Sequence, residues 1–305
     1  MSAAAPRWRQ HALLALRREA SALRAAVTLW LDCNAFSHAG SLAFYTLFSL
    51  APTVIIAVAV IGIVYGEQAA QGQIVAQLQD VMGREAARAV EQAVVRSRPQ
   101  ESGLLPTVLG VAALLMGATT VFAQIQFSLN AIWGVAARPD RSGLLMLLRA
   151  RLLSLTLVLA IGFVLLVSLL AGVMLRALLH FTHRFVPAVE YLLGSAELLV
   201  SLGMVTLLFA AIFKVLPDVV LRWREVLFGA FVTALLFSVG RYGIAAYLAY
   251  TATASTYGAA GSVVLVLLWV YYSSLILLFG AAYTKTHLLA AGRAVQPRRS
   301  AVLRG

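Results

Sequence analysis

Residues 259–284 read AAGSVVLVLLWVYYSSLILLFGAAYT, a continuous apolar stretch without a charged side chain. A helix needs about 20 apolar residues to cross a hydrocarbon core of about 30 Å, and this stretch is long enough. Backbone groups inside a bilayer must be hydrogen-bonded locally, and the alternating strands of a membrane barrel are not seen in this sequence. The stretch therefore predicts a membrane-spanning helix.

Five further stretches are similarly long and predominantly apolar, over residues 41–65, 104–133, 152–176, 191–213 and 226–250. The chain is 61% hydrophobic and 12% charged, whereas an ordinary soluble domain has about 45–50% and about 25%. We therefore expect an all-α, polytopic membrane protein with six transmembrane helices. Its predicted parts are a cytoplasmic N-terminal segment 1–40, a transmembrane domain 41–284 and a basic cytoplasmic tail 285–305.

The basic residues indicate the orientation of these spans. Most of the 24 Lys and Arg residues fall on one side, namely in the N-terminal segment, in the loops near 138–151 and 214–224, and in the tail. Because basic loops stay in the cytoplasm, we expect a multi-pass protein of the bacterial inner membrane with both termini cytoplasmic. The same basic face would attract anionic lipid headgroups. We expect membrane lipids as partners and no nucleic acid.

Two polar segments show helical spacing. Between Leu13 and Phe36, apolar residues recur every three or four positions among arginines, which predicts an amphipathic helix along the membrane surface. The arginines also interrupt the apolar run that a cleaved signal peptide needs. In the outer loop 66–103, similar spacing with a break near Gly83 predicts two short amphipathic helices. These helices would either rest on the outer leaflet or cap the bundle.

Three passages carry a family resemblance. The first is His38-Ala-Gly-Ser-Leu-Ala-Phe-Tyr-Thr-Leu-Phe-Ser-Leu-Ala-Pro52, and the second runs from Gly110 through Gly117 to Leu129-Asn-Ala-Ile-Trp-Gly134. The third comprises Leu216-Pro-Asp218, Arg222-Trp-Arg224, Gly229-Ala230, Tyr257-Gly-Ala-Ala-Gly-Ser262 and Leu268-Trp-Val-Tyr-Tyr272. In this order they resemble the YihY/BrkB family of bacterial inner-membrane proteins, some of which carry an old ribonuclease label.

The resemblance implies the architecture of an inner-membrane helical protein but no agreed reaction. One position departs from it, because the family's last span usually closes with Gly-Ala-Glu, whereas this chain has Gly280-Ala281-Ala282. A role for that carboxylate is therefore not carried over to this protein.

Two charged residues lie within predicted spans. Glu197 and Arg241 are placed about 9 and 13 Å below the outer ends of their spans, at about 1.5 Å per helical residue. Charges inside a bilayer are expensive and mark functional sites by default. The two residues are candidates for a polar pathway. The alternative is a structural ion pair, or an arginine that reaches back to the interface.

Polar side chains also occur in the second and last spans. Thr120, Gln124, Gln126 and Asn130 follow helical spacing near the inner end of the second span, and Tyr271 and Tyr272 lie in the middle of the last. They are candidates for a polar cavity. The alternative is hydrogen bonding between helices, which contributes about 0.6 kcal/mol per side chain.

Three classes of function come into question for this chain. A transporter, exporter or lipid-handling conduit for an amphiphilic solute fits the six spans and the few polar groups within them. A membrane scaffold or regulatory partner in envelope assembly is the alternative. An enzyme is not expected, ribonuclease included, since the five histidines are scattered and the single cysteine, Cys33, stands alone. No metal or other cofactor is expected either.

Overall fold

The computed structural model describes residues 7–66, 72, 74–76, 78–79, 87–88, 90–92, 104–138, 189–251 and 261–304. The elements follow the order α1 (Arg7–Asp32), α2 (Ala35–Tyr65), α5 (Leu104–Trp133), β1 (Val135–Ala137), α7 (Val189–Val215), α8 (Trp223–Thr251), α9 (Gly261–Ala290) and β2 (Ala301–Leu303). This part of the chain is mostly helical, in agreement with the predicted all-α class. The predicted span 152–176 lies outside the described residues.

The long helices coincide with the apolar stretches of the sequence. Helix α5 covers the same residues as the stretch 104–133, whereas α9 continues to Ala290, past the predicted boundary at 284. Among the described residues, Trp223–Gly243 and Val266–Ala290 are long and apolar enough to cross a membrane, and Leu199–Val215 is a shorter apolar helix. The number of spans thus stays a prediction.

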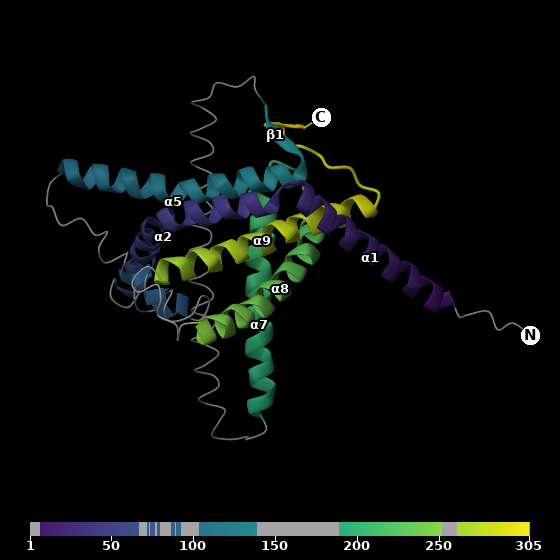
Figure 1. Ribbon diagram of the computed structural model, residues 1–305, viewed down its shortest axis with the longest axis horizontal. Coiled ribbons are helices and arrows are strands. Elements are labelled where there is room, and N and C mark those ends of the chain that lie inside the picture. The colour runs from purple at the N-terminus through teal and green to yellow at the C-terminus, as the bar shows by residue number, and fades with distance from the viewer. Residues whose placement is uncertain are drawn as a thin grey trace, which may run out of the picture.

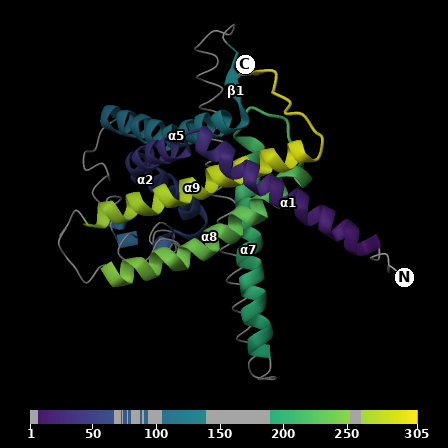
Figure 2. The ribbon, with the colours of Figure 1, turned by 45° about the vertical axis from the view of Figure 1, so that its right-hand side comes forward.

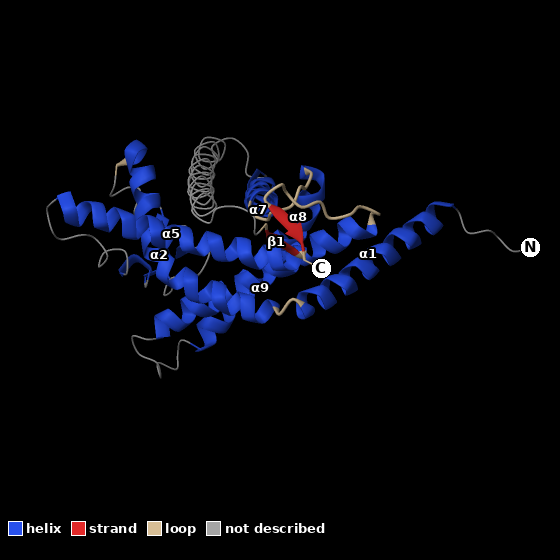
Figure 3. Ribbon diagram, turned by 90° about the horizontal axis from the view of Figure 1, so that it is seen from above, coloured by secondary structure: helices blue, strands red, loops and turns tan. Residues whose placement is uncertain are grey.

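The helices pack as a bundle that one helix crosses (Figure 1). Helix α2 contacts both α5 and α9, and α8 lies between α9 and α7. Helix α7 runs across the direction of α5, α8 and α9 in Figure 1 and also in Figure 2. Helix α1 packs along α9 and then extends away from the bundle, which is also clear from above in Figure 3. Helices of similar length and apolar character therefore run in different directions in this fold.

Glycines and hydroxyls bring α8 and α9 into close contact. A Cβ on Gly280 would lie 1.9 Å from Thr233 Oγ1, and a Cβ on Gly229 would lie 1.9 Å from Thr284 Oγ1. Each threonine hydroxyl donates to the carbonyl of the glycine four residues earlier in its own helix, at 2.6 Å for Thr233 and 2.7 Å for Thr284. Their polar atoms are thus satisfied within a buried contact. Small residues of this kind allow membrane helices to approach closely.

The buried side chains form two clusters. The larger one gathers where α5, α7, α8 and α9 meet, and its fully buried members include Leu129, Trp133, Phe213, Val226 and Leu278. The smaller one joins α2 and α9 to the segment between α2 and α5 through Val54, Val58, Ala87, Val90, Val266 and Trp269. Described residues of this segment near 74–79 and 87–92 are helical, and Ala87 and Val90 are buried against the bundle. The predicted break near Gly83 lies outside the described residues.

The C-terminal segment folds back on the bundle. Strand β2 pairs antiparallel with β1, with Val135 opposite Leu303 and Ala137 opposite Ala301. Val220 N–H donates to the Gln296 carbonyl at 2.8 Å, which joins the segment to the α7–α8 loop. Gly134 and Gly292 end α5 and α9 with positive φ angles of 70° and 74°, as is common after a helix. We call residues 134–138, 216–222 and 293–304 the platform.

Candidate functional site

Asp218 is the centre of a polar cluster in the platform. Its Oδ2 accepts hydrogen bonds from Gln126 Nε2 at 3.1 Å and from Asn130 Nδ2 at 2.9 Å. The backbone N–H of Asp218 donates in return to Asn130 Oδ1 at 2.8 Å. Gln126 and Asn130 are four residues apart and therefore share one face of α5. The carboxylate of the α7–α8 loop is thereby fixed against the end of α5.

The C-terminal segment adds to this cluster. Arg298 N–H donates to the Asp218 carbonyl at 2.8 Å, and its guanidinium donates to the carbonyls of Lys214 at 3.0 Å and Val215 at 3.2 Å. These are the last residues of α7, whose carbonyls lack partners within the helix. A positive charge at this C-terminal end also interacts favourably with the dipole of the helix. The C-terminal segment of the platform is therefore joined to the ends of α5 and α7.

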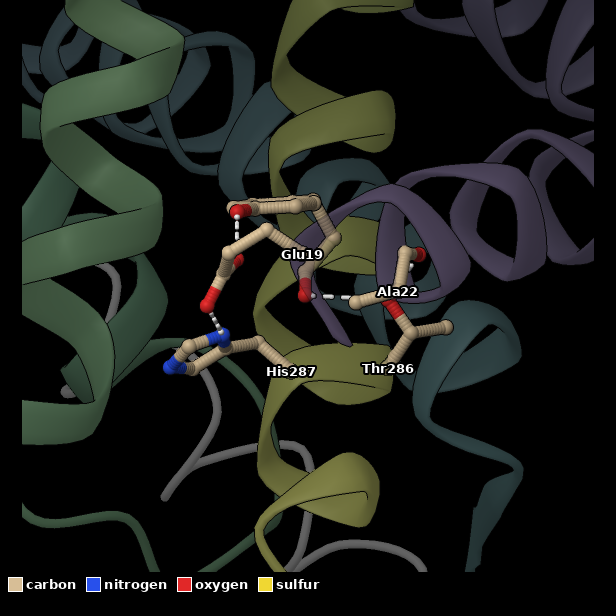
Figure 4. A network of polar contacts seen from close by, with 5 residues as sticks. Glu19, Ala22, Thr286 and His287 are labelled. Atoms are coloured by element: carbon tan, nitrogen blue, oxygen red, sulfur yellow. Dashed lines mark hydrogen bonds and ion pairs between the residues drawn. The ribbon is translucent and has the colours of Figure 1, made fainter. Parts of the chain in front are cut away.

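A second polar cluster fixes α1 to α9 (Figure 4). Glu19 Oε2 accepts a hydrogen bond from Tyr283 Oη at 2.7 Å, and Glu19 Oε1 lies 3.5 Å from His287 Nδ1. Thr286 Oγ1 lies one residue before this histidine and donates to the Ala22 carbonyl at 3.0 Å. Figure 4 shows Glu19 facing His287, with Thr286 beside Ala22. Three side chains of α9 thus hold one turn of α1.

Beside this contact, an open groove runs between α1 and α9. It has a volume of about 550 Å³. Its polar lining comprises Ser21, Arg24, Thr28 and Asp32 of α1 with Lys285 and Thr286 of α9, and Ala25, Leu29 and Leu289 supply apolar surface. Lys285 Nζ donates to the Ile132 carbonyl at 2.9 Å, so this cation is anchored to the end of α5. The groove combines two basic side chains, one acidic side chain and hydroxyls.

Helix α1 also has an apolar stripe on the surface of the protein. Leu23, Val27 and Leu31 are 46%, 41% and 50% exposed, and they follow one another at intervals of four residues. Ala22 and Ala26 are buried on the side that packs against α9. The helix thus has three sectors, namely a buried sector, an exposed apolar stripe and the polar side of the groove. This division is typical of a helix that lies at an interface between water and lipid.

A histidine lies where α2 meets α5, before the predicted span that begins at 41. His38 Nδ1 lies 3.1 Å from Ser128 Oγ, and the two side chains form a polar contact between the helices. Burial, followed by the positive charge of Arg304, lowers the pKa of His38 below its ordinary value. The neutral imidazole is therefore the form that this packing favours.

The other four polar-cavity candidates lie on α5 and α9. Thr120 Oγ1 donates to the Met116 carbonyl of its own helix at 2.6 Å, and Gln124 is half-buried one turn away. Tyr272 packs so closely on α8 that a Cβ on Gly240 would lie 1.6 Å from its hydroxyl oxygen, and Tyr271 is half-buried beside it. Of the six polar-cavity candidates, Gln126 and Asn130 meet at Asp218.

The predicted charge pair falls on neighbouring helices, since Glu197 is in α7, Arg241 is in α8 and these helices contact one another. Arg241 Nη2 donates to Tyr242 Oη at 3.3 Å, and its guanidinium lies 5.1 Å from the centre of that ring. The side chain of Glu197 lies outside the described residues, so the pair stays a prediction.

Reasoning from the sequence missed Asp218 and Glu19 as site residues. Both are acids in segments rich in arginine, and a partly buried acid needs a partner. For Asp218, a signal was present in the two amides four residues apart on α5. For Glu19, the partners Tyr283 and His287 are 264 and 268 residues away in sequence, and no local pattern connects them.

The described chain is a helical membrane protein in which a folded C-terminal segment joins the ends of the helices. The family model for virulence factor BrkB matches residues 27–301. The chain therefore belongs to the BrkB family, and the resemblance seen in the sequence is confirmed.

Several relatives bear the name UPF0761 membrane protein. One from Tolumonas auensis is 33% identical over 183 residues, which cover 59% of this chain and 57% of the relative. One from Nitrosospira multiformis is 30% identical over 252 residues, which cover 81% of this chain and 56% of the relative. One from Pseudomonas paraeruginosa is 33% identical over 177 residues, which cover 57% of this chain and 41% of the relative. The chain thus matches about half the length of these relatives. No solved structure matches the chain.

Proposed function

We propose that this protein handles a lipid or another amphiphilic solute in the bacterial inner membrane, as a transporter, exporter or conduit without enzymatic activity. The observation that carries the proposal is the arrangement on α1, where an exposed apolar stripe lies beside a groove with charged and hydroxyl side chains. An amphiphile has the matching chemistry, a polar head next to an apolar chain. Membership of a family of membrane proteins supports this location.

The proposal includes six spans and cytoplasmic termini. It places the basic groove at the inner surface, where anionic headgroups are abundant. A reporter fused after Gly305 is expected to signal the cytoplasm, and one inserted near Gln100 is expected to signal the outer compartment. Reversed signals would overturn the orientation.

Lipid movement tests the function directly. Purified protein is reconstituted in liposomes with a headgroup-labelled fluorescent lipid, and an added quencher reports which labels have reached the outer leaflet. We expect faster exchange with wild type than with empty liposomes, and a loss of this gain in Glu197→Ala. Equal rates for wild type and empty liposomes would count against a passive lipid pathway.

The Glu197 and Arg241 pair has its own test. Each single alanine variant is expected to lower the thermal stability in detergent, and the reciprocal charge swap is expected to recover part of the loss. If the swap is no better than the two single changes together, the pair does not exist.

A scaffold or regulatory partner in envelope assembly is the second candidate. The observation that favours it is the engagement of Gln126 and Asn130 with Asp218, which uses polar groups of α5 for a fixed platform. Glu197→Ala or Arg241→Ala distinguishes the two candidates in cells. A scaffold is expected to tolerate either change if the protein is still folded and inserted, whereas a conduit is expected to lose its function.

A further inference from the structure

We propose that the groove between α1 and α9 binds the phosphate of an anionic phospholipid headgroup, with the guanidinium of Arg24 as its main ligand. The proposal rests on the proposed function, because it requires α1 to lie at the membrane surface.

The charges in the groove fit a singly charged phosphodiester. Arg24 and Lys285 are basic and Asp32 is acidic, so the ionised groove carries one net positive charge. The side chain of Arg24 is exposed, and its planar guanidinium can bind two oxygens of a phosphate. Lys285 uses one of its three donors on the Ile132 carbonyl, and its side chain also lines the groove.

The spacing along α1 places the polar groups in one row. Arg24, Thr28 and Asp32 follow one another at intervals of four residues, so they lie on one side of the helix. Thr28 Oγ1 donates to the Arg24 carbonyl at 3.2 Å, which fixes the hydroxyl within this row. Asp32 stands at the end of the row and repels a phosphate there. The anion is therefore expected nearer to Arg24.

The apolar stripe indicates a lipid as the source of the phosphate. Leu31 and Arg24 are seven residues apart, close to two turns, so the stripe of Leu23, Val27 and Leu31 borders the row that contains Arg24. Acyl chains would cover these exposed side chains while the headgroup occupies the groove. A free phosphate would leave the stripe without a role.

Binding is tested with the full chain in detergent micelles that contain dioleoylphosphatidylglycerol, and bound lipid is counted by native mass spectrometry. We expect Arg24→Gln to weaken the apparent Kd about fivefold, the usual contribution of one basic residue near an anionic surface. Asp32→Asn is expected to strengthen binding by a similar factor, since it removes the repelling charge. The matched control is Arg299→Gln, which removes an exposed charge that does not line the groove.

Three outcomes would overturn the proposal. An equal loss in Arg24→Gln and Arg299→Gln would show diffuse attraction to the basic surface. Equal binding of dioleoylphosphatidylcholine, with the same dependence on Arg24, would remove the selection for an anionic headgroup. Displacement of the lipid by inorganic phosphate at the same concentration would make free phosphate the ligand.

The result can be separated from that of the lipid-movement assay. If wild type binds the anionic lipid through Arg24 but moves no lipid, the groove stands and the conduit function fails. If wild type moves lipid while Arg24→Gln binds the anionic lipid as tightly as wild type, the conduit stands and the groove proposal fails.

Discussion

Asn130 and Asp218 exchange two hydrogen bonds although 88 residues of sequence separate them. The amide nitrogen of Asn130 donates to the carboxylate at 2.9 Å, and its amide oxygen accepts from the Asp218 backbone at 2.8 Å. An asparagine provides both a donor and an acceptor, so it can satisfy a charged acceptor and a backbone N–H together. This reciprocal contact fixes the α7–α8 loop to the end of α5.

Asn130→Ala is expected to destabilise the protein by about 2 kcal/mol, because a hydrogen bond to a charged group contributes about 1.5–3 kcal/mol. Thermal unfolding in detergent measures the change. Gln124→Ala is the matched control, since it removes an amide from the same helix but leaves the Asp218 contacts intact. An equally large effect of Gln124→Ala would contradict the role assigned to Asn130.

Arg298 and Arg299 are neighbours with opposite environments. Arg298 donates to two carbonyls at the end of α7, whereas Arg299 is exposed. We expect Arg298→Ala to lower the unfolding free energy by about 1.5–3 kcal/mol and Arg299→Ala to change it by about 0.5 kcal/mol or less. Parallel melting curves of the two variants measure the difference. Equal melting temperatures would mean that the guanidinium does not cap α7.

The close contact of α8 with α9 predicts a steric effect. A Cβ at Gly280 would lie 1.9 Å from Thr233 Oγ1, so Gly280→Ala requires the helices to move and is expected to cost about 1–3 kcal/mol. Thr233→Ala in the same chain removes the clashing oxygen and is expected to restore part of the stability. Gly203→Ala in α7 is the control, because nothing lies within 4 Å of its added Cβ. A harmless Gly280→Ala would disprove this packing.

The helices of this fold can be predicted from the sequence, but the way in which they pack cannot. Apolar length and the scarcity of charge indicate α2, α5, α7, α8 and α9, because a long and predominantly apolar run has few alternatives to a helix in a membrane. The crossing direction of α7 depends on the side chains that it meets, and a predominantly apolar run gives little information about them. The sequence therefore identified the helices but not their arrangement.

The platform was missed for a different reason. The sequence of residues 285–305 predicts only a basic tail, since a three-residue strand has no detectable period. Strand β2 exists because β1 pairs with it and because Asp218 and the carbonyls of α7 bind the neighbouring residues 298–300. Contacts that span about 80 residues of sequence give no local pattern. The two amides of α5 were recognised as polar candidates, but their acidic partner was not.

Tyr283→Phe is expected to loosen α1. The change removes the hydroxyl that donates to Glu19 at 2.7 Å and leaves the ring in place. Hydrogen exchange measured by mass spectrometry should become faster in peptides from α1, because this contact holds α1 against α9. Exchange in peptides from α5 is the internal reference. Unchanged exchange in α1 would show that the Glu19 contact does not contribute to docking.

His38 predicts a dependence of stability on pH. Burial and the charge of Arg304 lower the pKa of His38 in the folded protein, so the unfolded chain binds the proton more readily. Stability is therefore expected to fall as the pH drops below about 6.5, the ordinary pKa of histidine, until His38 is also protonated in the folded state. Melting temperatures at neutral pH and near pH 5.5 measure the effect.

Two variants test the origin of this pH dependence. His38→Gln is expected to show a smaller fall in melting temperature than wild type, because its side chain does not titrate. Arg304→Gln removes a positive charge that acts on His38, so the pKa of His38 rises toward its ordinary value and the fall should also shrink. If wild type and His38→Gln lose the same number of degrees, the pH dependence arises from other groups and His38 is not responsible for it.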